Sequence, residues 1–281
     1  MDGKALEFVI LTDTHFLPRG GTMYGMDPRA RLDAAIEVIN RDHPDLEFVV
    51  ILGDLADNGE RAAYENLADS VSKLAAPLVL MMGNHDRRGA FRESFPKADD
   101  DGTGFIQALR VLPQASILTL DTLDEDGNTH VGILCPKRLE FLERSLHEAP
   151  KDRPLLLLQH HHSGKVGLRS MDHYNVRNAE EQWAVFQRAG RKPDYMFHGH
   201  IHRPIFGLWH GIPYHIQRGV NHQVGFDLDT DDKIPGSLEG PDYALVRVST
   251  DTIAVHHRQF LYEGPSYWLH DADAVSGRFP A

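Results

Sequence analysis

The stretch LEFVILTDTH, residues 6–15, carries most of the information about the class of fold. It opens with a run of apolar residues, predicted as a strand over 6–13, and it ends in the polar residues Asp13 and His15. A short apolar run without alternation is typical of a strand buried on both faces. The next segments repeat the pattern, with an amphipathic helix predicted over 28–42 and a second buried strand over 46–54.

The alternation continues with a helix over 59–75 and a strand over 77–84. Strands that alternate with helices predict parallel pairing and an α/β fold. Further elements are expected along the rest of the chain: strands over 115–122, 153–160 and 193–200, a turn over 124–128, helices over 136–149 and 178–190, and short antiparallel strands over 205–217, 243–250 and 252–260. We expect one domain over residues 1–281.

Composition limits the partners of the protein. A hydrophobic content of 41% is enough for a full-sized core, and a formal net charge of −12 argues against a groove for long nucleic acid. No apolar run is long enough for membrane insertion and residues 1–20 do not resemble a signal peptide, so the expected location is cytoplasmic. A small anionic substrate remains compatible with this charge if bound metal ions supply positive charge locally.

Every predicted buried strand of the parallel type ends in side chains that can bind a metal. These side chains are Asp13 and His15, Asp54, Asn84 and His85, His160, His161 and His162, and His200 and His202. In open α/β sheets, sites form in the crevice outside the carboxyl ends of the strands. Carboxylates, an amide oxygen and neutral imidazoles suit a two-metal site of mixed nitrogen and oxygen ligands.

The motifs differ in how specific they are. GHIH (199–202) is the strongest, because alternation along an extended chain puts both histidine rings on one side. DTH (13–15) and GD (53–54) are weak alone, since Asp often closes a turn or caps a helix. GNHD (83–86) and HHH (160–162) lie between these extremes. Seven other histidines are interpreted as ordinary surface or core residues: His43, His130, His147, His210, His256, His257 and His270. His198, inside the predicted strand, is interpreted as a residue that supports the ligands or packs in the core.

As an ordered set, DTH, GD, GNHD, QHHH and GHIH resemble the signature of the calcineurin-like metallophosphoesterases. The similarity is closest to the branch of bacterial glycerophosphodiesterases and class III cyclic-nucleotide phosphodiesterases. Supporting details are YG (24–25), MD (171–172), NHQV (221–224) and YEGPSYW (262–268). The resemblance implies a double β-sheet sandwich flanked by helices, with a dimetal site at the carboxyl ends of the strands.

The resemblance also implies a role for each matching residue. One ion is expected on Asp13, His15 and His202, the second on Asn84, His160 and His200, with Asp54 bridging both. His85 matches a histidine that contacts the phosphate or protonates the leaving group, and His222 and His161 match supporting positions. The implied cofactors are two divalent or mixed-valence ions from among Mn, Fe, Co and Zn.

The implied reaction is hydrolysis of a small phosphodiester, of the glycerophosphodiester or cyclic nucleotide type, by in-line attack of a metal-bridging hydroxide. A departure from the close relatives leaves the substrate open: HHHSGKVG (160–167) stands where they carry HHPP, and it adds Lys165.

The alternatives are a phosphomonoesterase that uses the same site and a non-catalytic metal-binding scaffold. The scaffold is disfavoured because every ligand position is filled. A hydrolase of non-phosphate substrates on another dimetal fold would be expected to carry an H-x-H-x-D-H run, which this sequence lacks.

Two segments suggest features beyond the site. Residues 226–243 are acidic and rich in Gly and Pro, which predicts a surface or lid loop. The tail over 261–281 contains the YEGPSYW motif, and we expect it to take part in the contacts of a homo-oligomer.

Overall fold

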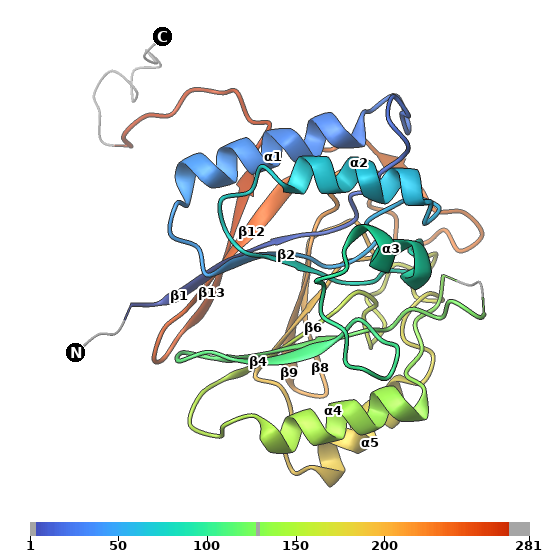
Figure 1. Cartoon of the computed structure of the whole chain (residues 1–281), viewed down its shortest axis with the longest axis vertical. Helices are drawn as coiled ribbons and strands as arrows, with labels where there is room; N and C mark the ends of the chain where they lie inside the picture. Colours follow the sequence, from blue (N-terminus) through green and yellow to red (C-terminus); the bar gives the residue numbers. More distant parts are fainter. Residues whose placement is uncertain (1–3, 128–129, 270–281) are drawn as a thin grey trace.

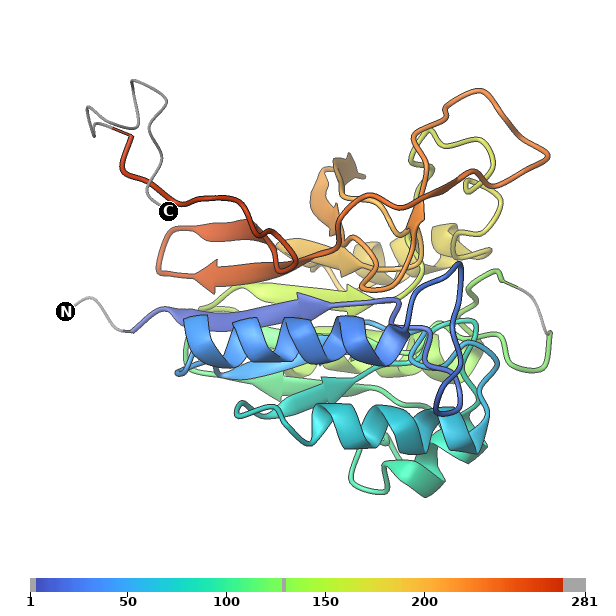
Figure 2. The same cartoon turned by 90° about the horizontal axis from the view of Figure 1, so that it is seen from above.

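The computed structural model describes residues 4–127 and 130–269, and in these ranges two β-sheets pack face to face (Figures 1 and 2). The first sheet has the order β13 (Ile253–Gln259), β12 (Asp242–Val248), β1 (Leu6–Leu11), β2 (Phe48–Ile51) and β3 (Leu78–Leu80). The second has the order β4 (Ala108–Val111), β5 (Ser116–Leu120), β6 (Leu155–Gln159), β7 (Tyr195–His198), β9 (Ile212–Ile216) and β8 (Ile205–Trp209). A small antiparallel pair joins β10 (Gln223–Val224) to β11 (Gly236–Ser237).

Helices cover the outer face of each sheet. The first sheet is covered by α1 (Pro28–Asp42), α2 (Arg61–Val71) and α3 (Arg88–Ser94), and the second by α4 (Pro136–Glu148) and α5 (Ala179–Arg188), as Figure 1 shows. The four layers are therefore helix, sheet, sheet and helix. This confirms the double β-sheet sandwich flanked by helices.

The parallel pairings are those that the alternating pattern predicted. β1 pairs in parallel with β2 and β2 with β3, while β5, β6 and β7 form the corresponding parallel set in the second sheet. β12 pairs antiparallel with both β1 and β13, and β8 pairs antiparallel with β9, as expected for the C-terminal part. The prediction was wrong in one respect, because β9 also pairs in parallel with β7.

Side chains of β1 alternate between two cores. Phe8 and Ile10 belong to the core between the sheets, where the Phe8 ring stacks on Phe48 at 4.7 Å and meets Phe197 edge-on at 6.2 Å. Val9 and Leu11 belong to the core beneath the helices of the first sheet. A strand buried on both faces needs apolar residues at every position, which is why its sequence shows a continuous apolar run.

The ends of the strands differ most from the predicted bounds. The strand predicted over 46–54 ends as β2 at Ile51, because the chain turns at Gly53, where φ is 106°, and at Asp54. The short helix α3 and the edge strand β4 were not predicted, since seven and four residues carry too little periodicity. By contrast α1 has the predicted bounds, fixed by an Asp27 cap that accepts from the Arg29 backbone N–H and by Pro28 at the first helical position.

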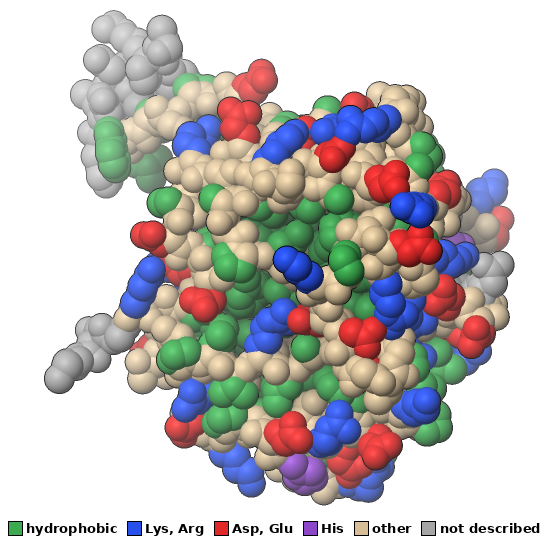
Figure 3. Space-filling model, viewed as in Figure 1, with side chains coloured by type: hydrophobic (Ala, Val, Ile, Leu, Met, Phe, Trp, Pro, Cys, Tyr) green, Lys and Arg blue, Asp and Glu red, His purple; other side chains and the backbone are tan. Residues whose placement is uncertain are grey.

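Parts of some predictions lie outside the described residues, namely residues 270–281 of the tail, His270, and Asn128 of the expected turn. Within the described ranges, every helix is too short or too polar to cross a bilayer. On the face seen in Figure 3, basic and acidic side chains are interspersed, so this face carries no continuous basic surface.

Candidate metal centre

Five of the predicted ligand residues have a left-handed backbone conformation. Their φ angles are 55° at Asp13, 44° at His15, 48° at Asp54, 70° at His200 and 51° at His202. This conformation is uncommon for residues other than glycine and is held in place only when the surrounding structure enforces it, as at active sites. All five residues lie just beyond the carboxyl ends of parallel strands.

Hydrogen bonds between the loops enforce these conformations. The backbone N–H of Asp13 donates to Gly53 O at 3.1 Å, and that of His15 donates to Asp54 O at 2.9 Å. The backbone N–H of His200 donates to Asp13 Oδ2 at 3.0 Å, which joins the loop after β7 of the second sheet to the loop after β1 of the first. The site therefore lies at one end of both sheets.

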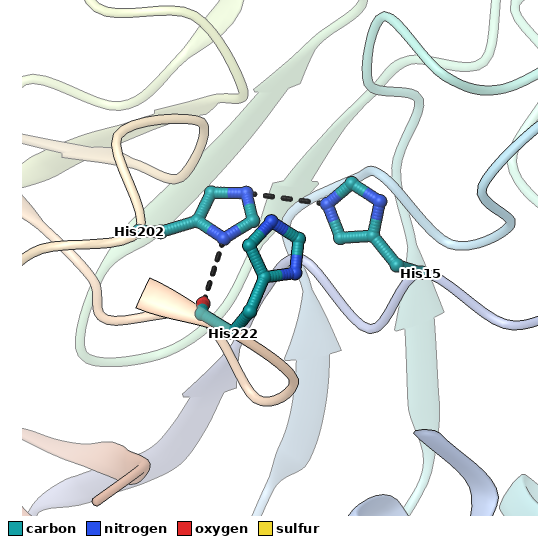
Figure 4. A group of neighbouring side chains, drawn as sticks. All are labelled: His15, His202 and His222. Carbon is teal, nitrogen blue, oxygen red and sulfur yellow. Dashed lines mark hydrogen bonds between the residues drawn. The ribbon is translucent and has the colours of Figure 1, made fainter. Parts of the chain in front are cut away.

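The first group of candidate ligands is Asp13, His15, Asp54 and His202, whose ligand atoms all lie within 4.8 Å of one another. His202 Nε2 is 3.2 Å from Asp13 Oδ1 and 3.2 Å from His15 Nε2, and His15 Nε2 is 3.7 Å from Asp54 Oδ2. Figure 4 shows the facing ring nitrogens of His15 and His202. Two imidazole nitrogens and two carboxylates directed at one point suit a shared cation.

The other ring nitrogens of this group are used to orient the rings. His15 Nδ1 donates to Asp57 Oδ1 at 3.1 Å, and His202 Nδ1 donates to the backbone oxygen of His222 at 2.8 Å. Such bonds fix the tautomer that leaves Nε2 free for a metal. Asp57 was not singled out from the sequence, although its place three residues after Asp54 in GDLAD offered a signal.

The second group contains His160 and His200, which cluster with His161. Asn84, which follows β3 of the first sheet, lines the same cavity as His200 and Asp54. His160 Nδ1 donates to Leu52 O at 2.8 Å, which directs Nε2 toward Asp54 Oδ2 at 3.4 Å. Among the described residues, His160 Nε2, His200 Nε2 and Asn84 Oδ1 are buried and have no hydrogen-bond partner. Buried polar atoms are almost always paired, so these three unpaired atoms fit a cation as their missing partner.

Asp54 lies between the two groups. Its Oδ2 is within 3.7 Å of His15 Nε2 and 3.4 Å of His160 Nε2, while Oδ1 accepts from the His85 backbone N–H at 2.9 Å. Burial alone would raise the pKa of Asp54, but His160 and His85 hold it well below its ordinary value. The carboxylate therefore stays ionised in a position from which it can serve both groups.

The three residues predicted to assist catalysis have different surroundings. His85 Nδ1 donates to the Asp57 backbone oxygen at 2.6 Å, and although burial opposes it, the Asp54 carboxylate raises the pKa of His85. The His222 ring lies 4.3 Å from that of His202, and burial lowers the pKa of His222 to about 2. His161 is fully buried, and its Nδ1 is 2.7 Å from Thr122 Oγ1. His85 and His222 line the cavity described below, whereas His161 is not part of its lining.

Asp86 ties together two of the loops that carry ligands. Its carboxylate accepts from the backbone N–H groups of Leu55 and Ala56 on one loop and Gly83 on the other, and from the hydroxyl of Tyr64. Burial, aided by the nearby Asp54 charge, raises the pKa of Asp86 to about 6.

A cavity of about 570 Å³ opens above the two groups. Its floor includes His15, Asp54, Asn84, His200 and His202, and its rim includes Tyr24, Met171, Tyr174, Ile234 and Leu238. The orange segment that stands away from the body in Figure 2 belongs to the predicted loop region, and residues 234–238 of it line this cavity. Asp231 of the same segment accepts from His173 Nε2 at 2.6 Å, which joins it to the loop after β6.

The structure places two further residues, His130 and Lys165, relative to this cavity. His130, interpreted as an ordinary surface or core residue, lines the cavity, and its Nδ1 accepts from Asn84 Nδ2 at 2.8 Å. His130 is exposed, as a surface residue would be, and the contact with Asn84 is an additional feature that joins residues far apart in the chain. Lys165, the added charge of the HHHSGKVG segment, is exposed and lies outside the lining of the cavity.

Comparison with known proteins agrees with this arrangement. The Calcineurin-like phosphoesterase family profile matches residues 6–204. The chain is 54% identical over 270 residues to a probable cyclic nucleotide phosphodiesterase of Rhodopseudomonas palustris, which covers 96% of this chain and 98% of that protein. It is 33% identical over 226 residues to the 3′,5′-cyclic adenosine monophosphate phosphodiesterase CpdA of Escherichia coli, with 78% and 80% covered. It is also 28% identical over 262 residues to a probable glycerophosphodiester phosphodiesterase, GpdQ, of Arcobacter nitrofigilis, with 92% and 94% covered.

Proposed function

The chain belongs to the calcineurin-like phosphoesterase family, and from this membership we propose that it is a metal-dependent phosphodiesterase acting on small phosphodiesters of the cyclic nucleotide or glycerophosphodiester type. The observation that carries the proposal is the convergence of two groups of buried ligand atoms on Asp54 beside an open cavity. One group is Asp13, His15 and His202. The other includes three buried atoms without a hydrogen-bond partner among the described residues, on Asn84, His160 and His200. Its relatives named as phosphodiesterases support a diester rather than a monoester substrate.

We assign Asp13, His15 and His202 to one ion and Asn84, His160 and His200 to the other, with Asp54 shared. Two divalent ions supply Lewis-acid activation of a water nucleophile and of the phosphoryl oxygens when they are bound. Mn, Fe, Co and Zn all suit this set of imidazole, carboxylate and amide donors, and we propose a pair drawn from these metals.

The other residues act on the substrate or on the ligands. His85 uses Nδ1 to hold Asp57 O, which leaves Nε2 for a phosphoryl oxygen or the leaving oxygen, and its raised pKa favours a proton there. The low pKa of His222 keeps its ring neutral above the floor, where it can hydrogen-bond a substrate oxygen without opposing the cations. We assign His161 a packing role against His200, whose ring centroid is 4.6 Å away.

The decisive experiment combines metal content with turnover. Elemental analysis of the purified protein is paired with hydrolysis of bis(p-nitrophenyl) phosphate before chelation, after chelation, and after Mn, Co or Zn is added back. We expect about two metals per chain and diesterase activity that disappears and returns with them. Metal without turnover would favour the scaffold alternative, and faster turnover of p-nitrophenyl phosphate would favour a phosphomonoesterase.

The sharing of Asp54 can be tested by Asp54→Asn, which keeps the shape and removes the charge. Loss of at least one metal and of activity is expected, because both groups use this carboxylate. His147→Gln, at an exposed position of α4, is the matched control and should leave both unchanged. Full metal content and rate in Asp54→Asn would refute the assignment.

We also propose that residues 226–243 form a lid and that the chain self-associates. The lid is supported by residues 234–238 in the cavity wall and by the bond from His173 to Asp231.

Self-association is supported by exposed apolar side chains in the described part of the tail, including Tyr262, Trp268 and Leu269. Light scattering of the full chain and of a chain ending at residue 260 would test the second proposal.

A further inference from the structure

A row of aromatic rings crosses the cavity from one rim to the other. The successive ring centroids are 4.9 Å apart from Tyr24 to His222, 4.9 Å from His222 to His15, 4.8 Å from His15 to His85, 5.2 Å from His85 to His130, and 6.0 Å from His130 to Tyr174. The inner four rings are the histidines of the floor and its surroundings. The tyrosine at each end therefore marks where a substrate bound at the floor would extend outward.

Tyr24 is the more unusual of the two tyrosines. Its side chain is 70% exposed, and its backbone has a φ of 51°, which is uncommon for a large residue. A pair of backbone hydrogen bonds between Met23 and Met26, both 2.9 Å, closes the turn that holds it. Asn221 Nδ2 also contacts Met23 Sδ at 3.5 Å. The turn thus imposes a strained conformation on a residue whose ring is not needed for the core.

The Tyr24 ring has an open face. Its contact with His222 is edge-on, with an interplanar angle of 63°, and this leaves most of the ring exposed. Leu238 and Ile234 line the same cavity and are also exposed, at 70% and 50%. Apolar side chains that converge on a cavity with a polar floor are typical of a ligand site rather than of a random surface.

We infer that Tyr24, together with Ile234 and Leu238, forms a subsite for the nucleobase of the substrate. The inference rests on the proposed function and narrows it, because it selects a nucleotide over a glycerophosphodiester. A nucleobase presents a flat face that stacks on an aromatic ring, whereas glycerol and ethanolamine have no comparable apolar surface. A quaternary ammonium would be expected to need a cage of several aromatic faces, whereas among the described residues the ring in contact with Tyr24 is that of His222, which meets it edge-on.

The test compares two variants that keep the backbone conformation accessible. Tyr24→Asn removes the ring but tolerates the left-handed conformation, so folding is preserved. Tyr24→Phe keeps the ring and is the matched control. Each is assayed with 3′,5′-cyclic AMP and with glycerophosphoethanolamine, and binding of AMP is measured by calorimetry on the metal-loaded protein without turnover.

We expect Tyr24→Asn to raise KM for 3′,5′-cyclic AMP and Kd for AMP about 10-fold, since stacking of a base on an aromatic ring is worth roughly 1–3 kcal/mol. In Tyr24→Asn, KM for glycerophosphoethanolamine should stay within about 2-fold of the wild-type value. Tyr24→Phe should match the wild type in both KM values and in Kd for AMP.

Three results would overturn the inference: equal effects of Tyr24→Asn on both diesters, no binding of AMP to the wild type, or turnover of glycerophosphoethanolamine but not of cyclic AMP. Failure of the proposed function looks different, because the wild type would then hydrolyse neither diester nor bis(p-nitrophenyl) phosphate. AMP binding that weakens in Tyr24→Asn would still support the subsite in that case.

Discussion

Replacing Asp86 by Asn should destabilise the protein by about 1–2 kcal/mol at pH 8. Asp86 Oδ2 accepts from the Gly83 N–H at 2.8 Å, and Oδ1 accepts from the Ala56 N–H and the Tyr64 hydroxyl. In Asp86→Asn one oxygen becomes an amide nitrogen, so at least one buried donor faces another donor whichever way the amide is turned. Losing a bond to a charged acceptor costs about 1.5–3 kcal/mol, and an unsatisfied buried N–H adds about 1–3 kcal/mol. Removing a buried carboxylate whose pKa is raised to about 6 offsets roughly 3 kcal/mol of this loss at pH 8.

The assay is urea unfolding of chelated protein at pH 8, so that metal binding does not contribute and the wild-type Asp86, with its pKa raised to about 6, is ionised. The expected loss corresponds to a fall in Tm of roughly 3–4 °C. Tyr64→Phe is the matched variant, because it removes one donor to Asp86 and the acceptor of the Arg87 N–H. It should cost about 1–2 kcal/mol.

A free energy of unfolding of Asp86→Asn equal to or greater than that of the wild type would contradict this prediction. The loops that begin at Asp54 and Gly83 would then be held by other contacts, and the role given to Asp86 as the tie between them would be wrong.

Three further predictions concern the metal centre. Although burial opposes it, Asp54 raises the pKa of His160 to about 9, so the metal-free protein is stabilised by this proton below about pH 6.5 and loses that contribution as the pH rises through 9. A bound ion must displace the His160 proton, so the apparent affinity of the protein for the metal should rise roughly 10-fold between pH 7 and pH 8. Equal metal affinities at the two pH values, measured by competition with a chelator, would contradict this. His130→Ala should weaken the second of two metal sites about 10-fold by calorimetry, because Asn84 loses the acceptor that orients its amide, and His130→Gln should recover part of the loss. Gly83→Ala places a Cβ against the Asp54 backbone nitrogen and carboxylate and should cost about 3 kcal/mol in urea unfolding with loss of metal. A stable variant with full metal content would contradict the close approach of the two loops.

Much of the fold could be predicted because its parallel strands are buried on both faces. β1 and β6 appear in the sequence as continuous apolar runs, and α1 begins at the cap and proline that predict it. The edge strand β4 is partly exposed along its length and has no clear alternation, so its sequence resembles a loop. Short elements such as α3 depend on packing that the sequence does not display.

The candidate ligands could be predicted for a similar reason. Parallel strands bring their carboxyl ends to one edge of the sheet. Polar residues at those positions therefore lie close together independently of the course of the loops. His130 and Asp57 could not be predicted in this way. Their partners Asn84 and His15 are 46 and 42 residues away, and the contacts depend on the course of irregular loops.

The metal centre draws its residues from both halves of the sandwich. Asp13, His15, Asp54 and Asn84 follow strands of the first sheet, and the ligands on the other side, His160, His200 and His202, follow strands of the second. A cation bound by Asp54 and His160 would therefore link the two sheets at this end of the sandwich. Removing the ion would take away this link between the sheets, while the contact between the Phe8 and Phe197 rings in the core would remain. Chelation would then weaken the contact between the two sheets and abolish phosphodiesterase activity at the same time.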